Sequence, residues 1–404
     1  MDELLIRALS LLGLAILVAL AARRLRLPYT VGLVLAGAAL VGFRVDPGLA
    51  LTHDLIFDVV LPPLLFEAAL NLSWRELRRD LVPVLTLASV GVVLCAGVVA
   101  WGLAYWLAWP IESALAFGAL IAATDPISVI ALLRDSGVTG RLRLLIESES
   151  LFNDGAAAVL FALVLVWFAH AGNIGWLEAA TIFGQTAGGG LLVGAVVGLA
   201  AVLVAGTSDD HLVETALSVC AAFGSFLVAE HFHASGVLAT VAAGIVMGNL
   251  GVLGPRAGFG LTLTAHGGAV VIEFWEFAAF LANSLVFLLI GSAIGIIDFA
   301  GEGWQALALA VGLNLVGRAV AVYPIGLAFS RSRWAIPLNE QHLLWWGGLR
   351  GALGLALALA LPLDLPRRED ILIFAFAVVA FSVIVQGLTS PLALRWLGLV
   401  PAKQ

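Results

Sequence analysis

Six charged residues stand inside long apolar stretches of the sequence, where their side chains could bind or carry an ion. If these stretches cross a lipid bilayer, each central charge costs at least about 2.5–3.5 kcal/mol and requires a partner or a water-filled cavity. Carboxylate, hydroxyl and backbone carbonyl oxygens together suit a monovalent cation such as Na⁺, Li⁺ or K⁺. The six residues are Glu67, Asp125, Glu149, Asp154, Arg318 and Arg350.

The motif Thr124-Asp125-Pro126 predicts a break in a helix. Proline lacks an N–H and clashes with the preceding turn. The carbonyls that such a break frees are tolerated at membrane depth only where they line a cavity. Thr124 and Asp125 are therefore candidate cation ligands. The alternative is a simple kink in which helix N-termini stabilise the Asp125 carboxylate.

A second motif, Glu149-Ser150-Leu-Phe-Asn153-Asp154, places two pairs of polar residues on one helix. Ser150 and Asp154 share one face, and Glu149 and Asn153 share another. The first face could hold a cation between a hydroxyl and a carboxylate, with Asp154 at the centre of the site. The alternative for Asp154 is a purely structural ion pair. For Glu149 we favour the structural role, a salt bridge to an arginine.

The remaining three charges have different sequence surroundings. Glu67 follows two prolines, and the sequence does not separate a third ion ligand from a protonated acid that is hydrogen-bonded in the core. Arg350 lies among glycines that let the backbone open, and its charge could offset the carbonyl ends of a broken helix. Arg318 lies in a continuous helical stretch and requires an acidic partner, for which we propose Glu149.

The composition is that of a membrane protein. Hydrophobic residues make up 62% of the 404 residues, charged residues 12%, and the mean hydropathy is +1.07. A soluble domain carries roughly 25% charged residues, so lipid must be the main solvent of this chain. We expect an all-α polytopic protein with no soluble domain. There is no basic tail that would indicate nucleic-acid binding, and Cys95 and Cys220 lie in apolar runs unsuited to a disulfide or metal site.

Thirteen apolar segments are candidate membrane spans, because about 20 apolar residues cross the hydrocarbon core. They lie near 4–22, 29–43, 53–72, 81–108, 113–134, 142–169, 184–206, 212–231, 235–250, 268–296, 303–328, 341–361 and 371–396.

The distribution of basic residues orients these spans. With the N-terminus outside and the C-terminus cytoplasmic, 14 of the 20 lysines and arginines fall on the cytoplasmic side, as the positive-inside rule requires. An odd number of spans permits two inverted six-helix repeats around a linker helix. Spans 5 and 12, which are both interrupted, occupy corresponding positions in the two halves, and such a pair indicates a transporter binding site.

Several motifs together resemble the cation/proton antiporter superfamily, in its sodium/proton exchanger branch. They are Thr124-Asp125-Pro126, Glu149-Ser150-Leu-Phe-Asn153-Asp154, Gly348-Leu-Arg350-Gly351, Phe66-Glu67, the run 235–244 and the run 285–291. The resemblance extends from about residue 10 to 395. It implies a homodimer with crossed discontinuous helices at spans 5 and 12 and an elevator-like alternating-access cycle.

The resemblance also implies roles for single residues. Asp154 resembles the carboxylate that binds the cation and the proton, and Asp125, Ser150, Glu67 and the Thr124 carbonyl resemble its co-ligands. Glu149 and Arg318 resemble a structural salt bridge, and Arg350 resembles the arginine near the helix crossing. Asn153, where related electrogenic antiporters carry aspartate, implies one-for-one electroneutral exchange.

We therefore expect one antiporter unit over residues 1–404 that acts in pH homeostasis and exchanges Na⁺ or Li⁺ for H⁺. The ion-transporting core would span about 81–169 and 303–396, with 53–72 contributing Glu67, and the other spans would form a dimerisation scaffold. The nearest alternative is K⁺/H⁺ antiport, and a cation channel or an intramembrane enzyme fits less well. We expect no enzymatic activity and no cofactor. The expected partners are lipid, the two transported ions and a second copy of the chain, in the inner membrane of a prokaryote.

Overall fold

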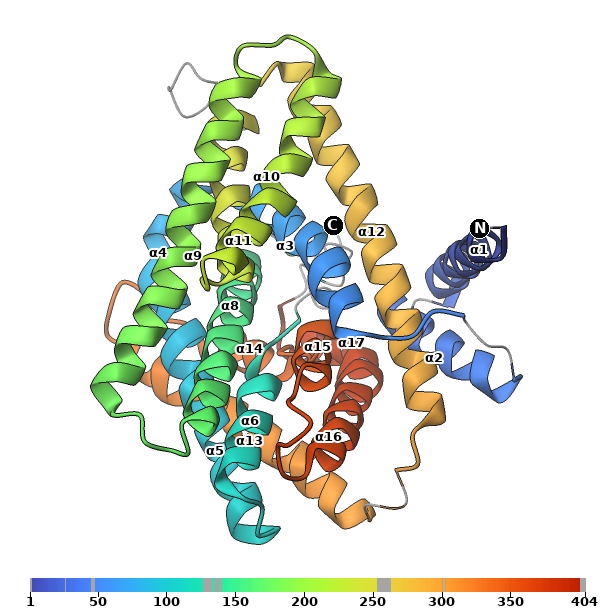
Figure 1. Cartoon of the computed structure of the whole chain (residues 1–404), viewed down its shortest axis with the longest axis vertical. Coiled ribbons are helices and arrows are strands. Elements are labelled where there is room, and N and C mark those ends of the chain that lie inside the picture. Colours follow the sequence, from blue (N-terminus) through green and yellow to red (C-terminus); the bar gives the residue numbers. More distant parts are fainter. Residues whose placement is uncertain are drawn as a thin grey trace. The chain divides into compact units, whose positions relative to one another are not determined.

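The computed structural model describes residues 2–25, 27–44, 48–125, 133, 138, 140–252, 263–299, 301 and 303–399. Within these residues the chain is helical and contains one isolated β-bridge (Figure 1). The α-helices are α1 (Asp2–Leu25), α2 (Tyr29–Gly42), α3 (Leu61–Leu70), α4 (Trp74–Thr86), α5 (Val92–Trp106), α6 (Ile111–Ala122), α8 (Arg141–Ala169), α9 (Trp176–Ala205), α10 (His211–His231), α11 (Gly236–Val246), α12 (Ala265–Ile296), α13 (Trp304–Phe329), α14 (Leu338–Trp346), α15 (Ala352–Leu359), α16 (Arg368–Phe381) and α17 (Gly387–Trp396).

Among the described residues, π-helical segments interrupt or join these helices at Leu55–Val60, Leu87–Gly91, Met247–Val252 and Ser382–Gln386. The first leads directly into α3, whose second and third residues are Pro62 and Pro63. The π-helical segment and α3 form one continuous helical stretch, so the two prolines lie inside it. A proline inside a helix removes an intrahelical hydrogen bond, and the change from π-helical to α-helical geometry occurs next to these two residues.

Every predicted span overlaps a helix of the structure. Seven helical stretches among the described residues are long and apolar enough to cross a membrane, so the chain is a multi-pass membrane protein. The others are shorter, among them Tyr29–Gly42 and Ile111–Ala122, and the count of thirteen crossings and the inverted repeats stay predictions. Residues 126–132 and 134 of span 5, with Pro126 among them, lie outside the described residues. Span 4 begins earlier than predicted, because the arginine-rich segment before residue 81 is also helical.

The contacts group the chain into two compact units. The first unit comprises residues 1–56, 83–153 and 283–404, and the second comprises residues 57–82 and 154–282. The division falls inside α8, between Asn153 and Asp154.

The first unit is organised around α5, which packs against α6 and α13. Small residues let these helices approach closely: a methyl group at Gly118 of α6 would overlap the Ala96 carbonyl of α5. α13 also packs against α14 and α16, and α15 packs against α6 and α16 (Figure 1). The two short helices α14 and α15 are thereby held among longer ones.

In the second unit α10 and α11 pack against each other, and each of them also packs against α9 and α3. Gly190, Gly194 and Gly198 repeat every four residues along α9 and lie against the backbone of α11. A side chain at Gly194 would overlap the Ala239 carbonyl. These glycines therefore form a stripe along which α9 packs closely against α11.

Candidate functional site

The end of one helix and the break between two others meet in the first unit. α6 ends at Ala122, and the chain continues in an extended conformation to Asp125. α14 ends at Trp346, and α15 begins six residues later at Ala352. The Asp125 N–H donates to the Leu349 carbonyl at 2.7 Å, which forms the isolated antiparallel bridge. The structure thus pairs the two non-helical segments that the sequence predicts at residues 124–125 and 347–351.

The first of these segments contacts α8 through Thr124 and Ser150. The Ser150 hydroxyl donates to the Thr124 carbonyl, and the Thr124 hydroxyl lies 3.3 Å from the Ser150 hydroxyl. Both residues are buried, at 3% and 1% exposure. A carbonyl oxygen and two hydroxyl oxygens therefore converge in the interior, and they are hard oxygen ligands suited to a dehydrated cation.

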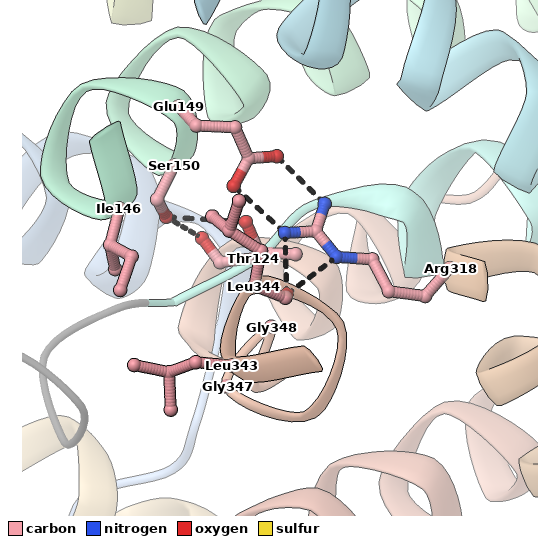
Figure 2. Close-up of a pocket in the computed structure, with 9 residues that line it drawn as sticks. All are labelled: Thr124, Ile146, Glu149, Ser150, Arg318, Leu343, Leu344, Gly347 and Gly348. Carbon is pink, nitrogen blue, oxygen red and sulfur yellow. Dashed lines mark hydrogen bonds and ion pairs between the residues drawn. The ribbon is translucent and has the colours of Figure 1, made fainter. Parts of the chain in front are cut away.

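A buried ion pair lies beside these oxygens (Figure 2). Arg318 Nη1 and Nη2 donate to the two carboxylate oxygens of Glu149 at 2.7 and 2.9 Å. Asn153 Nδ2 donates to Glu149 Oε1 at 3.1 Å, as expected for residues four apart on one helix face. Arg318 also donates from Nε and Nη2 to the Leu344 carbonyl, at 3.3 and 3.1 Å. One guanidinium thus neutralises a carboxylate and the C-terminal end of α14.

A small pocket joins the ion pair to the Thr124–Ser150 contact (Figure 2). Its cavity volume is about 10 Å³, which is room for about one water molecule. Its lining combines the polar groups just described with apolar side chains and two glycines of the α14–α15 break: Thr124, Ile146, Glu149, Ser150, Arg318, Leu343, Leu344, Gly347 and Gly348.

Arg350 neutralises the C-terminal end of α6. Its Nη1 donates to the Ala122 and Ala123 carbonyls at 2.8 and 2.9 Å, and its Nε donates to Asn314 Oδ1 at 3.0 Å. Arg350 lies between α14 and α15, yet it offsets the carbonyls at the C-terminus of α6. The sequence suggested this kind of role for Arg350 and left open which helix end receives it.

Asp125 lies at the start of α15. A methyl group at Gly351 would overlap the Asp125 carboxylate, so the two residues are in direct contact. Gly351 precedes the first residue of α15, and the N-terminus of a helix carries partial positive charge that favours an anion. The alternative weighed from the sequence, in which a helix N-terminus stabilises Asp125, therefore describes part of the environment of this carboxylate.

Asp154 and Glu67 belong to the second unit. Asp154 follows Ser150 by one turn of α8 and is half-buried. Glu67 is half-buried in α3, and its Oε1 accepts a hydrogen bond from Asn71 Nδ2 at 2.9 Å. Both carboxylates are retained as predicted ion ligands.

Three neutral polar residues also contact the site, and they were not predicted from the sequence. Asn314, Ser382 and Gln386 are buried at 2%, 0% and 1% exposure and hydrogen-bond to the α14–α15 break or to its arginine. The signal in the sequence that could have identified them is an amide or hydroxyl side chain inside an apolar span. Such a group requires a hydrogen-bond partner when it is buried, just as a buried charge requires a partner.

Comparison with known proteins identifies the family of this arrangement. The family described as "Sodium/hydrogen exchanger, transmembrane" matches residues 10–396. The chain belongs to the sodium/hydrogen exchanger family. This is a family of transporters, and membership agrees with the expectation that the protein is not an enzyme.

Relatives and solved structures extend this match over the whole chain. The chain is 39% identical to the Na⁺/H⁺ antiporter ApNhaP of Aphanothece halophytica, over 96% of this chain and 73% of the relative. It is 37% identical to the Na⁺/H⁺ antiporter NhaH of Halobacillus dabanensis, over 98% and 99%. Its fold is similar to that of the sodium proton antiporter MjNhaP1 of Methanocaldococcus jannaschii, with a TM-score of 0.76, 21% identity, and coverage of 98% and 99%.

Proposed function

We propose that the protein is a Na⁺/H⁺ antiporter that exchanges one monovalent cation for one proton by alternating access. One structural observation carries the proposal: the extended segment after α6 pairs with the α14–α15 break through Asp125 and Leu349, and Thr124 there meets Ser150 of α8 in the buried interior. The names of the relatives support Na⁺ as the cation.

Asp154 is the proposed carrier, because it follows Ser150 by one turn on the same helix. A bound cation favours the ionised carboxylate, and desolvation favours the protonated one. The two ions therefore compete for one group. An empty ionised carboxylate in a low-dielectric site is costly, so the loaded states are the ones that move. Asp125, Ser150, the Thr124 carbonyl and Glu67 are the proposed co-ligands.

Electroneutral exchange rests on Asn153. The residue before the proposed carrier is a neutral amide that donates to Glu149. It adds no second carboxylate that could bring an extra proton through the cycle.

We further propose a homodimer in the inner membrane of a prokaryote, with the N-terminus outside and the C-terminus inside and a role in pH homeostasis. The thirteen-span inverted repeat and the elevator movement of the core belong to the same proposal.

Substitution Asp154→Asn tests the proposed carrier. Purified protein in liposomes is supplied with Na⁺, Li⁺ or K⁺, and a pH-sensitive dye reports proton movement with and without a membrane potential. We expect Na⁺-driven proton flux in the wild type that is insensitive to the potential, and none in Asp154→Asn. The control is Asp209→Asn, which makes the same chemical change at an exposed position.

The outcomes separate the parts of the proposal. Substantial flux in folded Asp154→Asn would remove Asp154 from the carrier role. Flux that follows the potential would contradict electroneutrality. A response to K⁺ without a response to Na⁺ would replace Na⁺ as the cation.

A further inference from the structure

Two buried polar side chains of the first unit bind the backbone of the α14–α15 break. Ser382 and Gln386 lie in the π-helical segment between α16 and α17, at 0% and 1% exposure. Burying an amide or a hydroxyl without its hydrogen bonds is unfavourable by roughly 1–3 kcal/mol. π-Helical segments are rare and often occur at functional sites. These two side chains therefore need partners, and the break supplies them.

The hydrogen bonds form a chain across the break. Gln386 Nε2 donates to the Trp346 carbonyl at 2.9 Å, at the end of α14. The Ser382 hydroxyl donates to Gln386 Oε1 at 2.8 Å and accepts from the Arg350 N–H, also at 2.8 Å. Two side chains from one segment thus connect a carbonyl at the start of the break to an amide near its end.

The break needs this restraint for a physical reason. It frees backbone groups at membrane depth, where each requires a partner other than bulk water. Between Trp346 and Arg350 lie two glycines, which bring no side chain of their own, and Leu349, whose carbonyl accepts from the Asp125 N–H. The distance between the Trp346 carbonyl and the Arg350 N–H therefore fixes the position of the Leu349 carbonyl. It also fixes the backbone position from which the Arg350 side chain extends.

We propose that Ser382 and Gln386 are positioning residues of the transport site. They hold the break in the geometry that places Asp125 against the start of α15 and Arg350 against the end of α6. This inference rests on the proposed antiport function. Loss of either side chain leaves the proposed ion ligands in the chain but shifts the α14–α15 break, to which Asp125 binds. We therefore expect a change in the affinity of the protein for the cation.

Substitution Gln386→Met removes both hydrogen bonds at nearly constant length. We expect the apparent KM for Na⁺ to rise roughly two- to tenfold, the loss that corresponds to about one net hydrogen bond, with the maximal rate per folded protein changed less. Ser382→Ala should act in the same direction. The matched control is Thr389→Val, because the Thr389 hydroxyl accepts from the Trp346 indole and donates to the Val385 and Gln386 carbonyls of its own helical stretch, so that it binds the Trp346 side chain rather than the backbone of the break. That variant should lower the thermal midpoint and leave KM unchanged.

Substitution Gln386→Glu separates positioning from general stability. An ionised carboxylate can accept from Ser382 but cannot donate to the Trp346 carbonyl, whereas the protonated acid can do both. The ratio of its apparent KM to that of the wild type should fall toward one as the assay pH is lowered, while Gln386→Met shows a constant ratio.

Each result distinguishes the two proposals. Wild-type liposomes without Na⁺-driven proton flux would overturn the antiport function. Wild-type flux together with an unchanged KM in folded Gln386→Met and Ser382→Ala would overturn the positioning role, and so would a pH-independent ratio for Gln386→Glu. A lowered thermal midpoint with unchanged KM would make the two residues structural only.

Discussion

Substitution Glu149→Gln is expected to destabilise the protein strongly while the ion ligands stay in place. The Glu149 and Arg318 side chains are 2% and 6% exposed, and two hydrogen bonds of 2.7 and 2.9 Å join them. The amide keeps the shape of the side chain but removes its charge. It leaves the Arg318 guanidinium buried with the Leu344 carbonyl and a neutral group as its partners.

The size of the effect follows from burial. Removing one partner of a buried ion pair costs about 3–5 kcal/mol, because the other charge stays desolvated. For a chain of 404 residues, the average unfolding entropy of globular proteins gives roughly 0.85 kcal/mol per degree. The thermal midpoint should therefore fall by about 4–6 °C.

A matched control lies one half-turn earlier on the same helix. Arg143 Nε and Glu147 Oε1 are 2.6 Å apart, and their side chains are 35% and 19% exposed. Partly exposed pairs of this kind contribute about 0.2–1 kcal/mol, so Glu147→Gln should lower the midpoint by about 1 °C or less. Both variants are compared with the wild type in one detergent, at one heating rate, with unfolding followed by intrinsic fluorescence.

Adding Arg318→Met to Glu149→Gln should cost less than the sum of the two single variants, because it removes the stranded charge. Equal midpoints for Glu147→Gln and Glu149→Gln would contradict the argument from burial. A wild-type midpoint together with lost Na⁺ affinity in Glu149→Gln would instead make Glu149 a ligand of the ion.

Two glycine substitutions test close contacts in the two units. Gly351→Ala should reduce Na⁺-driven proton flux at least several-fold in folded protein, because the added methyl group overlaps the Asp125 carboxylate; Gly312→Ala, with nothing within 4 Å of the new methyl group, is the control. Equal flux in the two variants would show that the Asp125 contact is dispensable. Gly194→Ala should lower the thermal midpoint by several degrees, because the methyl group overlaps the backbone of α11, whereas Gly188→Ala on the same helix has open space and should be neutral. A neutral Gly194→Ala would mean that α9 and α11 can separate without loss.

The sequence predicted the helices well, because lipid imposes a simple rule on the chain. Backbone groups in hydrocarbon must be bonded within their own segment, so every long apolar run is helical. The same rule identified the breaks at 124–125 and 347–351, since proline and glycine clusters are the residues that interrupt a helix. The rule does not give lengths. The π-helical segments were not predicted, and α4 begins with an arginine-rich amphipathic segment that is helical without being continuously apolar.

For the site, charge was more informative than polarity. A lone arginine in an apolar run requires an acid, and the proposed partner of Arg318 was Glu149, with which it forms two hydrogen bonds. The position of Arg350 against the end of α6 could not be derived, because it depends on the crossing of segments more than two hundred residues apart. Ser382 and Gln386 escaped notice because neutral polar residues are common in membrane helices and their partners here are backbone atoms.

The pairing of Glu149 also bears on which acid can carry the transported ion. Both of its carboxylate oxygens accept from Arg318. Protonating Glu149 or giving it a cation would break this pair and leave a buried guanidinium without its counter-charge, at a cost of several kcal/mol. A carrier must change its charge partner in every cycle, so a carboxylate fixed in this way is unsuited to the task. Between Glu149 and Asp154, we therefore propose Asp154 as the acid whose charge changes during transport, whereas the Glu149 pair joins α8 to α13 and, through Arg318, to α14.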